Sequence, residues 1–251
     1  MTQVLTADCV AKTFGDRRVL SSATLHAVSG ELRVLFGRNG VGKSTLIKIA
    51  AGWLAPDGGN VYVGGQRVAS ITLAKLAARG VFYLPDHDLL SPAFSVRRQL
   101  EMIRAQFPGG SVEEAAEQVG ISERLSQRPW SLSGGERRRA ELAAALVRRP
   151  TCLLADEPYR GIAPKDAEDL TRIFRGLARN GVAVVVTGHE VPTLLDAADH
   201  VSWCTSGTTY ELGPPSVAVQ HDAFRREYLG EWYRAGVRIG AGDREARRLL
   251  P

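Results

Sequence analysis

One glycine-rich segment constrains the fold of this chain more than any other feature. Residues 37–44 read GRNGVGKS, after the apolar run Leu32–Phe36 and before a helix-like pattern over Ser44–Ala51. Glycines at these spacings let backbone amides turn inward at a helix N-terminus and form a nest for an anion. In the pattern G-x-x-x-x-G-K-[ST], Lys43 places a positive charge on the outer phosphates of a nucleotide, and the Ser44 hydroxyl can ligate Mg²⁺. The segment therefore predicts a strand, a phosphate-binding loop and a helix in direct succession.

A second apolar strand ends in two adjacent carboxylates. The run Thr151–Ala155 is followed by Asp156, Glu157 and Pro158. Asp156 at the strand tip suits a magnesium contact. Because side chains alternate along a strand, Glu157 is expected to point the other way, where it could orient and deprotonate a water molecule. An isolated Asp-Glu pair is usually a solvated turn, but together with the phosphate-binding loop it predicts a site that hydrolyses a nucleotide.

A third motif opens a long helical pattern. Residues 132–136 read LSGGE, and the spacing of Ser133 and Glu136 is that of a capping box. Capping explains these two residues but gives no reason for Gly134 and Gly135 between them. A helix start with free amides and glycine clearance is again suited to phosphate.

The order of apolar runs predicts an α/β fold. Short β-like runs broken by polar turns over Val4–Val34 indicate an antiparallel sheet that leads into a buried strand. Strands and helices alternate after Pro150, which favours a mainly parallel sheet. Residues from about 90 to 150 read as an inserted helical subdomain, and Pro214–Pro251 as a small helical tail.

Composition narrows the class of protein. The chain has 251 residues with 44% hydrophobic and 24% charged content, which excludes a disordered or fibrous protein. Its net charge of +5 suits a negatively charged partner, namely a nucleotide, a nucleic acid or an anionic membrane. The short cluster Arg137–Arg139 is read as a solvated helix face. Three separated cysteines fit no disulfide framework and indicate a reducing cytoplasm.

Together, the loop, the LSGGE motif and the carboxylate strand resemble the nucleotide-binding subunits of ATP-binding-cassette (ABC) transporters over about Val4–Leu229. This resemblance implies a RecA-like P-loop NTPase core, with one ATPase domain over residues 1–230 and a C-terminal helical tail over 231–251. It implies ATP and Mg²⁺ as cofactors, and two ATP-binding subunits that sandwich two ATPs head to tail. The further partners are transmembrane permease subunits, so the chain is expected in the cytoplasm, peripheral on the inner face of the cell membrane.

The resemblance also assigns roles to single residues. ATP binding within one chain falls to the residues Gly37, Arg38, Asn39, Gly40, Val41, Gly42, Lys43, Ser44 and Thr45. Ser133, Gly134 and Gly135 would contact the γ-phosphate held by the partner subunit. Asp156 resembles the magnesium-site aspartate and Glu157 the general base. Phe14 stands where the family has an aromatic residue that stacks on adenine, and His189 resembles the histidine that contacts the γ-phosphate.

Two positions depart from the family pattern. Asp86 stands where the family usually has a glutamine that touches the magnesium shell, so its carboxylate could favour the cation or repel the γ-phosphate. Ala163 stands where an aspartate normally crosses the dimer interface, and Asp166 is too far along the chain to replace it. We therefore expect ATP binding and dimerisation, with weaker coupling between the two sites.

The resemblance leaves other readings open. An ATP-sensing cassette with weak hydrolysis would explain Asp86 and Ala163, but it does not require Glu157 and His189. A soluble ABC protein that acts on DNA or ribosomes usually carries two cassettes or a long coiled-coil insertion, so no nucleic-acid partner is expected. The segments 133–141, 187–191 and 226–230 look most like the ATPases of lipopolysaccharide export and of branched-chain amino-acid import.

Overall fold

A computed structural model describes residues 2–107 and 109–230, so the helical tail predicted over 231–251 lies outside the described residues. Within the described part of the chain, the strands are β1 (Gln3–Phe14), β2 (Arg17–Val28), β3 (Leu32–Phe36), β4 (Gly58–Val63), β5 (Gln66–Arg67), β6 (Val81–Leu84), β7 (Cys152–Ala155), β8 (Ala183–Thr187), β9 (His200–Thr205) and β10 (Thr208–Gly213). The α-helices are α1 (Lys43–Ala50), α2 (Leu73–Ala78), α3 (Val96–Gln106), α4 (Val112–Gln118), α5 (Gly134–Arg148), α6 (Pro164–Arg179), α7 (Val191–Ala197), α8 (Pro215–Ala218) and α9 (Asp222–Phe224). Short 3₁₀ turns cover Ser122–Arg124 and Pro129–Ser131, and a π-helical turn covers Arg225–Leu229.

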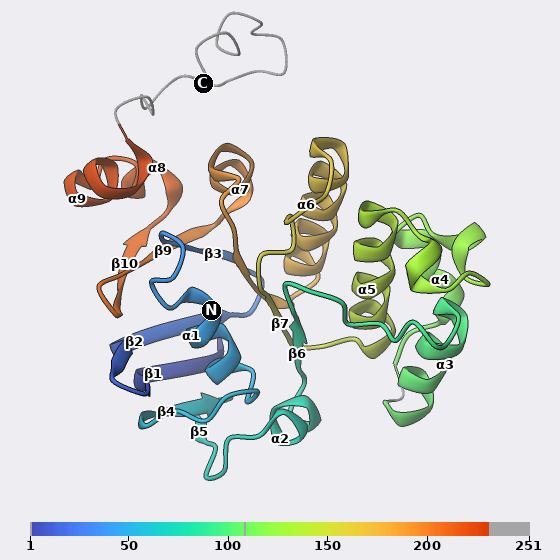
Figure 1. Ribbon diagram of the computed structural model, residues 1–251, viewed down its shortest axis with the longest axis horizontal. Coiled ribbons are helices and arrows are strands. Elements are labelled where there is room, and N and C mark those ends of the chain that lie inside the picture. Colours follow the sequence, from blue (N-terminus) through green and yellow to red (C-terminus); the bar gives the residue numbers. More distant parts are fainter. Residues whose placement is uncertain (1, 108, 231–251) are drawn as a thin grey trace, which may run out of the picture.

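The strands form one mixed sheet in the order β5-β4-β1-β2-β10-β9-β3-β8-β7-β6 (Figure 1). Strand β3 pairs in parallel with β8 and β9, and β7 pairs in parallel with β8 and β6. At the other end, β1 pairs antiparallel with β2 and β4. The predicted α/β fold with an N-terminal antiparallel part is therefore confirmed. Strand β10 pairs antiparallel with β9 and parallel with β2, and so joins the two parts.

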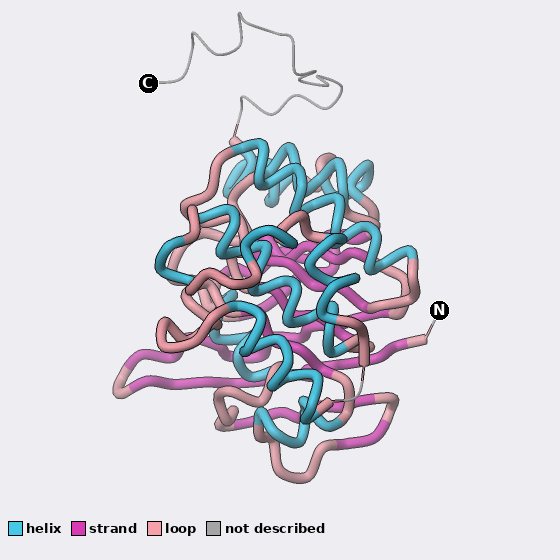
Figure 2. Tube along the Cα trace, turned by 90° about the vertical axis from the view of Figure 1, so that its right-hand side faces the viewer, coloured by secondary structure: helices cyan, strands magenta, loops and turns pink. Residues whose placement is uncertain are grey.

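Alternation along the strands builds a core on each face of the sheet. In β3, Val34 and Phe36 belong to one apolar cluster and Leu35 to the other. Helices α5, α6 and α7 supply the first cluster, and α1 supplies the second together with β1 and β2. Helices cover the central strands in the side view of Figure 2. Strands β7 and β8 are buried along their whole length, as expected for parallel strands covered on both faces.

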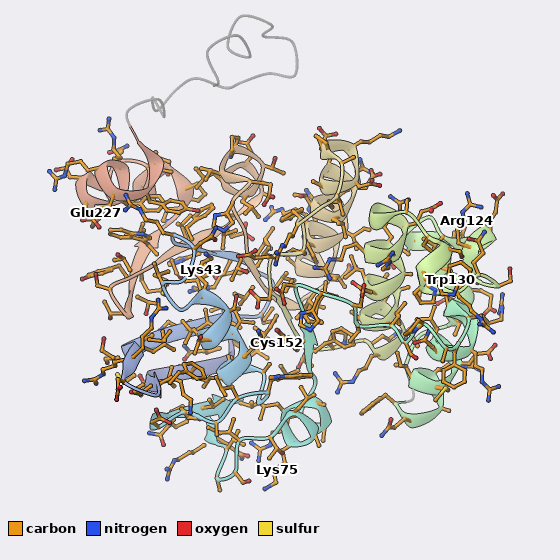
Figure 3. The ribbon with its side chains drawn as sticks, in the orientation of Figure 1. Lys43, Lys75, Arg124, Trp130, Cys152 and Glu227 are labelled. Atoms are coloured by element: carbon orange, nitrogen blue, oxygen red, sulfur yellow. The ribbon has the colours of Figure 1, made fainter. Side chains whose placement is uncertain are left out.

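Helices α3, α4 and α5 lie between β6 and β7 in the sequence, which is the region where the helical insertion is expected. They gather at the end of the molecule opposite the antiparallel strands (Figure 1). Figure 3 shows Trp130 and Arg124 in this part and Lys43 in the sheet part. The division of the chain into an ATPase domain with a helical subdomain remains an interpretation of this arrangement.

The parallel strands determine where a site can form. Because β3, β6, β7 and β8 run in the same direction, their carboxyl ends meet at one edge of the sheet. The segments that follow them begin at Gly37, Pro85, Asp156 and Gly188. Ligands of open α/β sheets bind at this edge.

Candidate active site

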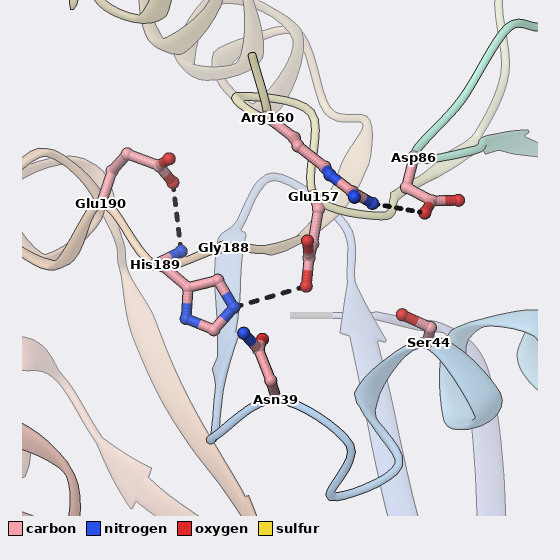
Figure 4. Close-up of a pocket in the computed structure, with 8 residues that line it drawn as sticks. All are labelled: Asn39, Ser44, Asp86, Glu157, Arg160, Gly188, His189 and Glu190. Atoms are coloured by element: carbon pink, nitrogen blue, oxygen red, sulfur yellow. Dashed lines mark hydrogen bonds and ion pairs between the residues drawn. The ribbon is translucent and has the colours of Figure 1, made fainter.

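A pocket of about 460 Å³ lies at the carboxyl ends of these strands (Figure 4). It is lined by Asn39, Ser44, Asp86, Glu157, Arg160, Gly188, His189 and Glu190. The structure thus brings five residues predicted from four separate segments into one pocket, namely Asn39, Ser44, Asp86, Glu157 and His189. Arg160 and Glu190 were not predicted.

The phosphate-binding loop folds around the side chain of Lys43. The Lys43 ammonium donates hydrogen bonds to the carbonyl oxygens of Gly37 at 2.7 Å and Arg38 at 3.2 Å, and it is 4.0 Å from Glu157 Oε1. Lys43 is only 4% exposed, and this burial lowers its pKa, against the opposing charges of Glu157 and other nearby acids. Gly37 admits no side chain, because a Cβ atom there would lie 2.5 Å from the carbonyl oxygen of Cys204.

Two other residues hold this loop from outside. The Arg17 guanidinium, on β2, donates to the carbonyl oxygen of Gly40 at 3.1 Å. The Arg38 Nε donates to the carbonyl oxygen of Glu227 at 3.0 Å. Glu227 lies in the C-terminal π-helical turn, on the same side of the molecule as Lys43 in Figure 3. The phosphate-binding loop is therefore attached to both the N-terminal and the C-terminal parts of the chain.

Asp156 is fully buried and forms a hydrogen-bonded centre. Its Oδ1 accepts hydrogen bonds from the hydroxyls of Ser44 and Thr187, both at 3.0 Å, and its Oδ2 accepts from Tyr83 at 3.5 Å. Burial raises the pKa of Asp156, while the hydroxyl donors act in the opposite direction. Sequence reasoning missed Thr187, whose only signal is a hydroxyl at the end of the apolar strand β8.

The oxygen atoms of Ser44 and Asp156 fit a magnesium ion that is shared with phosphate. Hard cations take oxygen ligands, and Mg²⁺ is usually held by one or two carboxylates plus substrate phosphates rather than by an all-protein cage. No group of three His, Cys, Asp or Glu residues suited to a metal ion occurs in the described part of the chain.

Glu157 has a left-handed backbone with φ of 43°. The sequence suggested that strand alternation sets the direction of the Glu157 side chain. Strand β7 ends at Ala155, however, so this direction follows from the turn after the strand. The Glu157 amide donates to Thr187 Oγ1 at 2.8 Å, which ties the turn to β8. The carboxylate is free to face the pocket, and its Oε1 lies 3.4 Å from His189 Nε2.

Asp86 lies in the pocket between two basic side chains. Its Oδ1 is 2.7 Å from His87 Nδ1, and its Oδ2 is 3.5 Å from the guanidinium of Arg160. Burial raises the pKa of Asp86, but the hydrogen bond and charge of His87 and the charge of Lys48 outweigh it, so the pKa lies below its usual value.

Comparisons with known proteins decide the family. A profile of the family described as "ABC transporter" matches residues 20–160. The chain is 32% identical over 237 residues to the lipopolysaccharide export system ATP-binding protein LptB of Escherichia coli K12, covering 92% of this chain and 98% of that protein. The chain belongs to the ABC transporter family. It is the ATPase subunit of a transporter.

Further comparisons agree with this family. The LptB protein of Haemophilus influenzae is 30% identical over 241 residues, which covers 92% of this chain and 99% of that protein. The fold is similar to a crystal structure of the ADP conformation of an ATP-binding cassette of an ABC transporter, with a TM-score of 0.77 and 23% identity, over 87% of this chain and 94% of that one.

Phe14 of this ABC subunit lies outside the pocket. It ends strand β1 and is 48% exposed, so it is not the core residue that an isolated Phe in a β-rich segment usually is. The Lys12 ammonium lies 5.7 Å from the centre of its ring. Phe14 pairs with Arg17, whose guanidinium reaches the phosphate-binding loop, so the exposed ring belongs to the hairpin attached to that loop.

The LSGGE motif of the ABC subunit also lies apart from the pocket. Ser133 and Gly134 are exposed, whereas Gly135 is buried. A capping box joins Ser133 and Glu136, as predicted from their spacing. Packing within the chain also requires a glycine at position 135, because a Cβ atom there would overlap the carboxylate of Asp166. Asp166 in turn pairs with Arg139 of its own chain.

The reading of Arg137–Arg139 as a solvated helix face is wrong. Arg138 is 6% exposed and donates to the carbonyl oxygens of Pro85 at 2.7 Å and Pro158 at 3.0 Å. It also pairs with Glu141 at 2.7 Å, and Glu141 accepts a hydrogen bond from the amide of Leu89. The helix that begins with the LSGGE motif therefore fixes both the turn after Glu157 and the loop that carries Asp86. The three consecutive arginines in the sequence give no signal for these contacts.

Nothing in the described residues could serve as a membrane-crossing helix, since every helix there is too short or too polar.

Replacing Arg138 by Met should lower the free energy of unfolding by about 3–5 kcal/mol, because it leaves the buried Glu141 carboxylate without its counter-charge. Adding Glu141→Leu to that variant should restore part of the loss, since the uncompensated charge is then removed. Urea denaturation of the purified proteins measures both effects.

The matched control is Arg137→Met, because Arg137 pairs with Asp88 at 3.0 Å on the surface. It should cost less than about 1 kcal/mol, as exposed ion pairs do. Equal losses for Arg137→Met and Arg138→Met would contradict the prediction.

The capping box makes stability depend on pH. The Ser133 amide and the Arg124 side chain donate hydrogen bonds to Glu136 and lower its pKa to about 2 from 4.5. Since the pKa is lower in the folded state, this contribution is present above about pH 4.5 and is lost as the pH falls towards 2. Glu136→Gln should therefore flatten the fall in unfolding free energy between pH 5 and 2.

Urea denaturation at several pH values measures this dependence. The control is Glu101→Gln on α3, because Glu101 lies 3.9 Å from Arg97 on an exposed helix face. Identical pH profiles for Glu136→Gln and wild type would show that the capping box does not hold the charge of Glu136.

Proposed function

We propose that this ABC subunit hydrolyses ATP in the pocket at the carboxyl ends of β3, β6, β7 and β8. The observation that supports this most directly is the junction of three separate segments: Ser44 and Thr187 both bind the buried Asp156, and Glu157 follows in the same turn with its carboxylate in the pocket. Phosphoryl transfer of this kind depends mainly on positioning and on stabilisation of charge.

In this proposal, the loop and the helix start at residues 37–45 bind the nucleotide. Amides at the start of α1 and the buried Lys43 ammonium provide positive charge for the phosphates. On phosphate binding, the Lys43 hydrogen bonds to Gly37 and Arg38 would hold the ammonium at the centre of the loop. Phe14, exposed on the adjacent hairpin, offers a flat surface for adenine.

The residues that would hold a magnesium ion are Ser44 and Asp156, with Asp86 as a further contact from the opposite loop. A bound Mg²⁺ would supply positive charge that offsets the charge of the phosphates. Asp156 serves this role because two hydroxyls and burial fix its orientation.

We propose that Glu157 is the general base in ATP hydrolysis. Its carboxylate faces the pocket within 4.0 Å of Lys43 and 3.4 Å of His189, so it is placed to accept a proton from a water molecule. We infer that His189 contacts the γ-phosphate and that its Nε2, 3.4 Å from Glu157 Oε1, orients that carboxylate. The amide of His189 is itself held by the Glu190 carboxylate at 3.1 Å.

The location of the LSGGE motif supports a dimer. Ser133 and Gly134 are exposed at the start of α5 and lie outside the pocket of their own chain. Free amides at a helix start suit phosphate. We infer that Ser133, Gly134 and Gly135 complete the site of a second ATP-binding subunit, head to tail, and that ATP-driven closure of this dimer moves a transmembrane permease. The likeness to LptB proteins supports a peripheral position on the cytoplasmic face of a membrane complex.

Glu157→Gln should keep ATP binding but lower turnover by about 10²–10⁴-fold, which is the usual contribution of a general base. Gln has almost the same shape and cannot take the proton. Steady-state phosphate release and equilibrium ATP binding by the purified protein measure the two quantities. Undiminished turnover would remove Glu157 from this role.

Asp86→Gln should shift the magnesium dependence of ATP hydrolysis, so that more Mg²⁺ is needed for half-maximal rate. The variant replaces a charged oxygen ligand by a neutral one in the same pocket. A magnesium titration at saturating ATP measures the shift. An unchanged titration would reject Asp86 as a contact of the ion.

A further inference from the structure

The pocket proposed to bind a triphosphate is rich in carboxylates. Asp86, Glu157 and Glu190 line it, and the buried Asp156 accepts a hydrogen bond from Ser44, which also lines it. Like charges disfavour one another strongly where solvent is partly excluded. When no metal ion is bound, a phosphate-binding pocket therefore needs positive charges that offset its carboxylates.

The backbone that leads into Asp86 is fixed by a buried side chain. The carbonyl of the preceding residue, Pro85, accepts a hydrogen bond from the buried guanidinium of Arg138 at 2.7 Å. The Asp86 side chain is 23% exposed. Its carboxylate lines the pocket from the loop that follows β6.

Arg160 lies on the turn that carries Glu157, and its side chain is 68% exposed. Its amide donates to the carbonyl oxygen of Glu157 at 3.1 Å, so both residues belong to one tight turn. The Arg160 guanidinium reaches across the pocket to Asp86 Oδ2 at 3.5 Å, as Figure 4 shows. The ion pair joins the loop after β6 to the turn that carries Glu157.

We propose that Arg160 is a positioning residue that cancels the charge of Asp86, so that the two side chains together make the pocket compatible with ATP. This inference rests on the proposed function of the pocket. Arg160 acts through Asp86 and not as a ligand of the phosphates. Arg160, three residues after Glu157, would thereby offset the charge of the aspartate at position 86.

The proposal predicts a specific pattern for single and double variants. Arg160→Ala leaves Asp86 facing the phosphates without its arginine partner and should weaken ATP binding roughly three- to tenfold, the range expected for charges at a partly exposed site. In metal-free buffer Asp86→Asn should not weaken it, because the proposed contact of Asp86 with Mg²⁺ then plays no part. The double variant Arg160→Ala/Asp86→Asn should bind ATP within about twofold of wild type, because the repulsion is then absent.

The experiment measures the binding of a fluorescent ATP analogue to the purified full chain in buffer that contains EDTA, so that no metal ion contributes. Steady-state kinetics with Mg²⁺ give a second reading, in which Arg160→Ala should raise KM and leave kcat nearly unchanged. Arg160→Lys keeps the positive charge and should bind the analogue within about twofold of wild type.

The matched control is Arg172→Ala, which removes the same charge from an exposed ion pair with Asp169 on α6, outside the pocket. It should leave the affinity for the analogue unchanged. A double variant as weak as Arg160→Ala would overturn the proposal, because Arg160 would then bind the phosphates itself. An Arg160→Ala affinity equal to that of wild type would also overturn it. Failure of the wild-type chain to bind the analogue would overturn the proposed function, and this inference with it.

Discussion

The hydrogen bonds of one buried carboxylate hold the site together. Asp156 follows β7, and its three donors come from other elements: Ser44 from the start of α1, Thr187 from the end of β8 and Tyr83 from β6. A buried charged group is stable only when such partners surround it. A shift in the register of any of these strands would remove a donor, so the same interactions that form the site also favour one arrangement of the parallel sheet.

The sequence predicts those parts of the site well in which the functional residues and the structure that positions them lie in one contiguous segment. Lys43 and Ser44 lie in a loop whose glycines, strand and helix are contiguous, so the motif carries its own structural context. Asp156 and His189 each follow a short apolar run, and such runs end at the same edge when they pair in parallel. The mixed sheet and the predicted helices follow from the same periodic patterns.

The parts that were missed depend on contacts between distant segments. Arg138 was read as solvated because charge clusters usually are, yet its guanidinium binds carbonyl oxygens of Pro85 and Pro158 from two different loops. The pairing of Arg160 with Asp86 has no local signal either. The direction of Glu157 was inferred from strand alternation, but the strand ends before it and a left-handed residue sets the direction instead.

At Glu157, the residue that favours stability differs from the residue that the proposed chemistry requires. A side chain with a Cβ atom in this left-handed conformation costs of the order of 1–3 kcal/mol, whereas glycine adopts it freely and asparagine with less difficulty. Selection for folding alone would thus favour Gly or Asn at position 157. A glutamate there lowers the free energy of unfolding, and interactions elsewhere in the fold must offset this loss. A stabilising substitution at this turn would yield a sturdier protein that has lost the carboxylate facing its pocket.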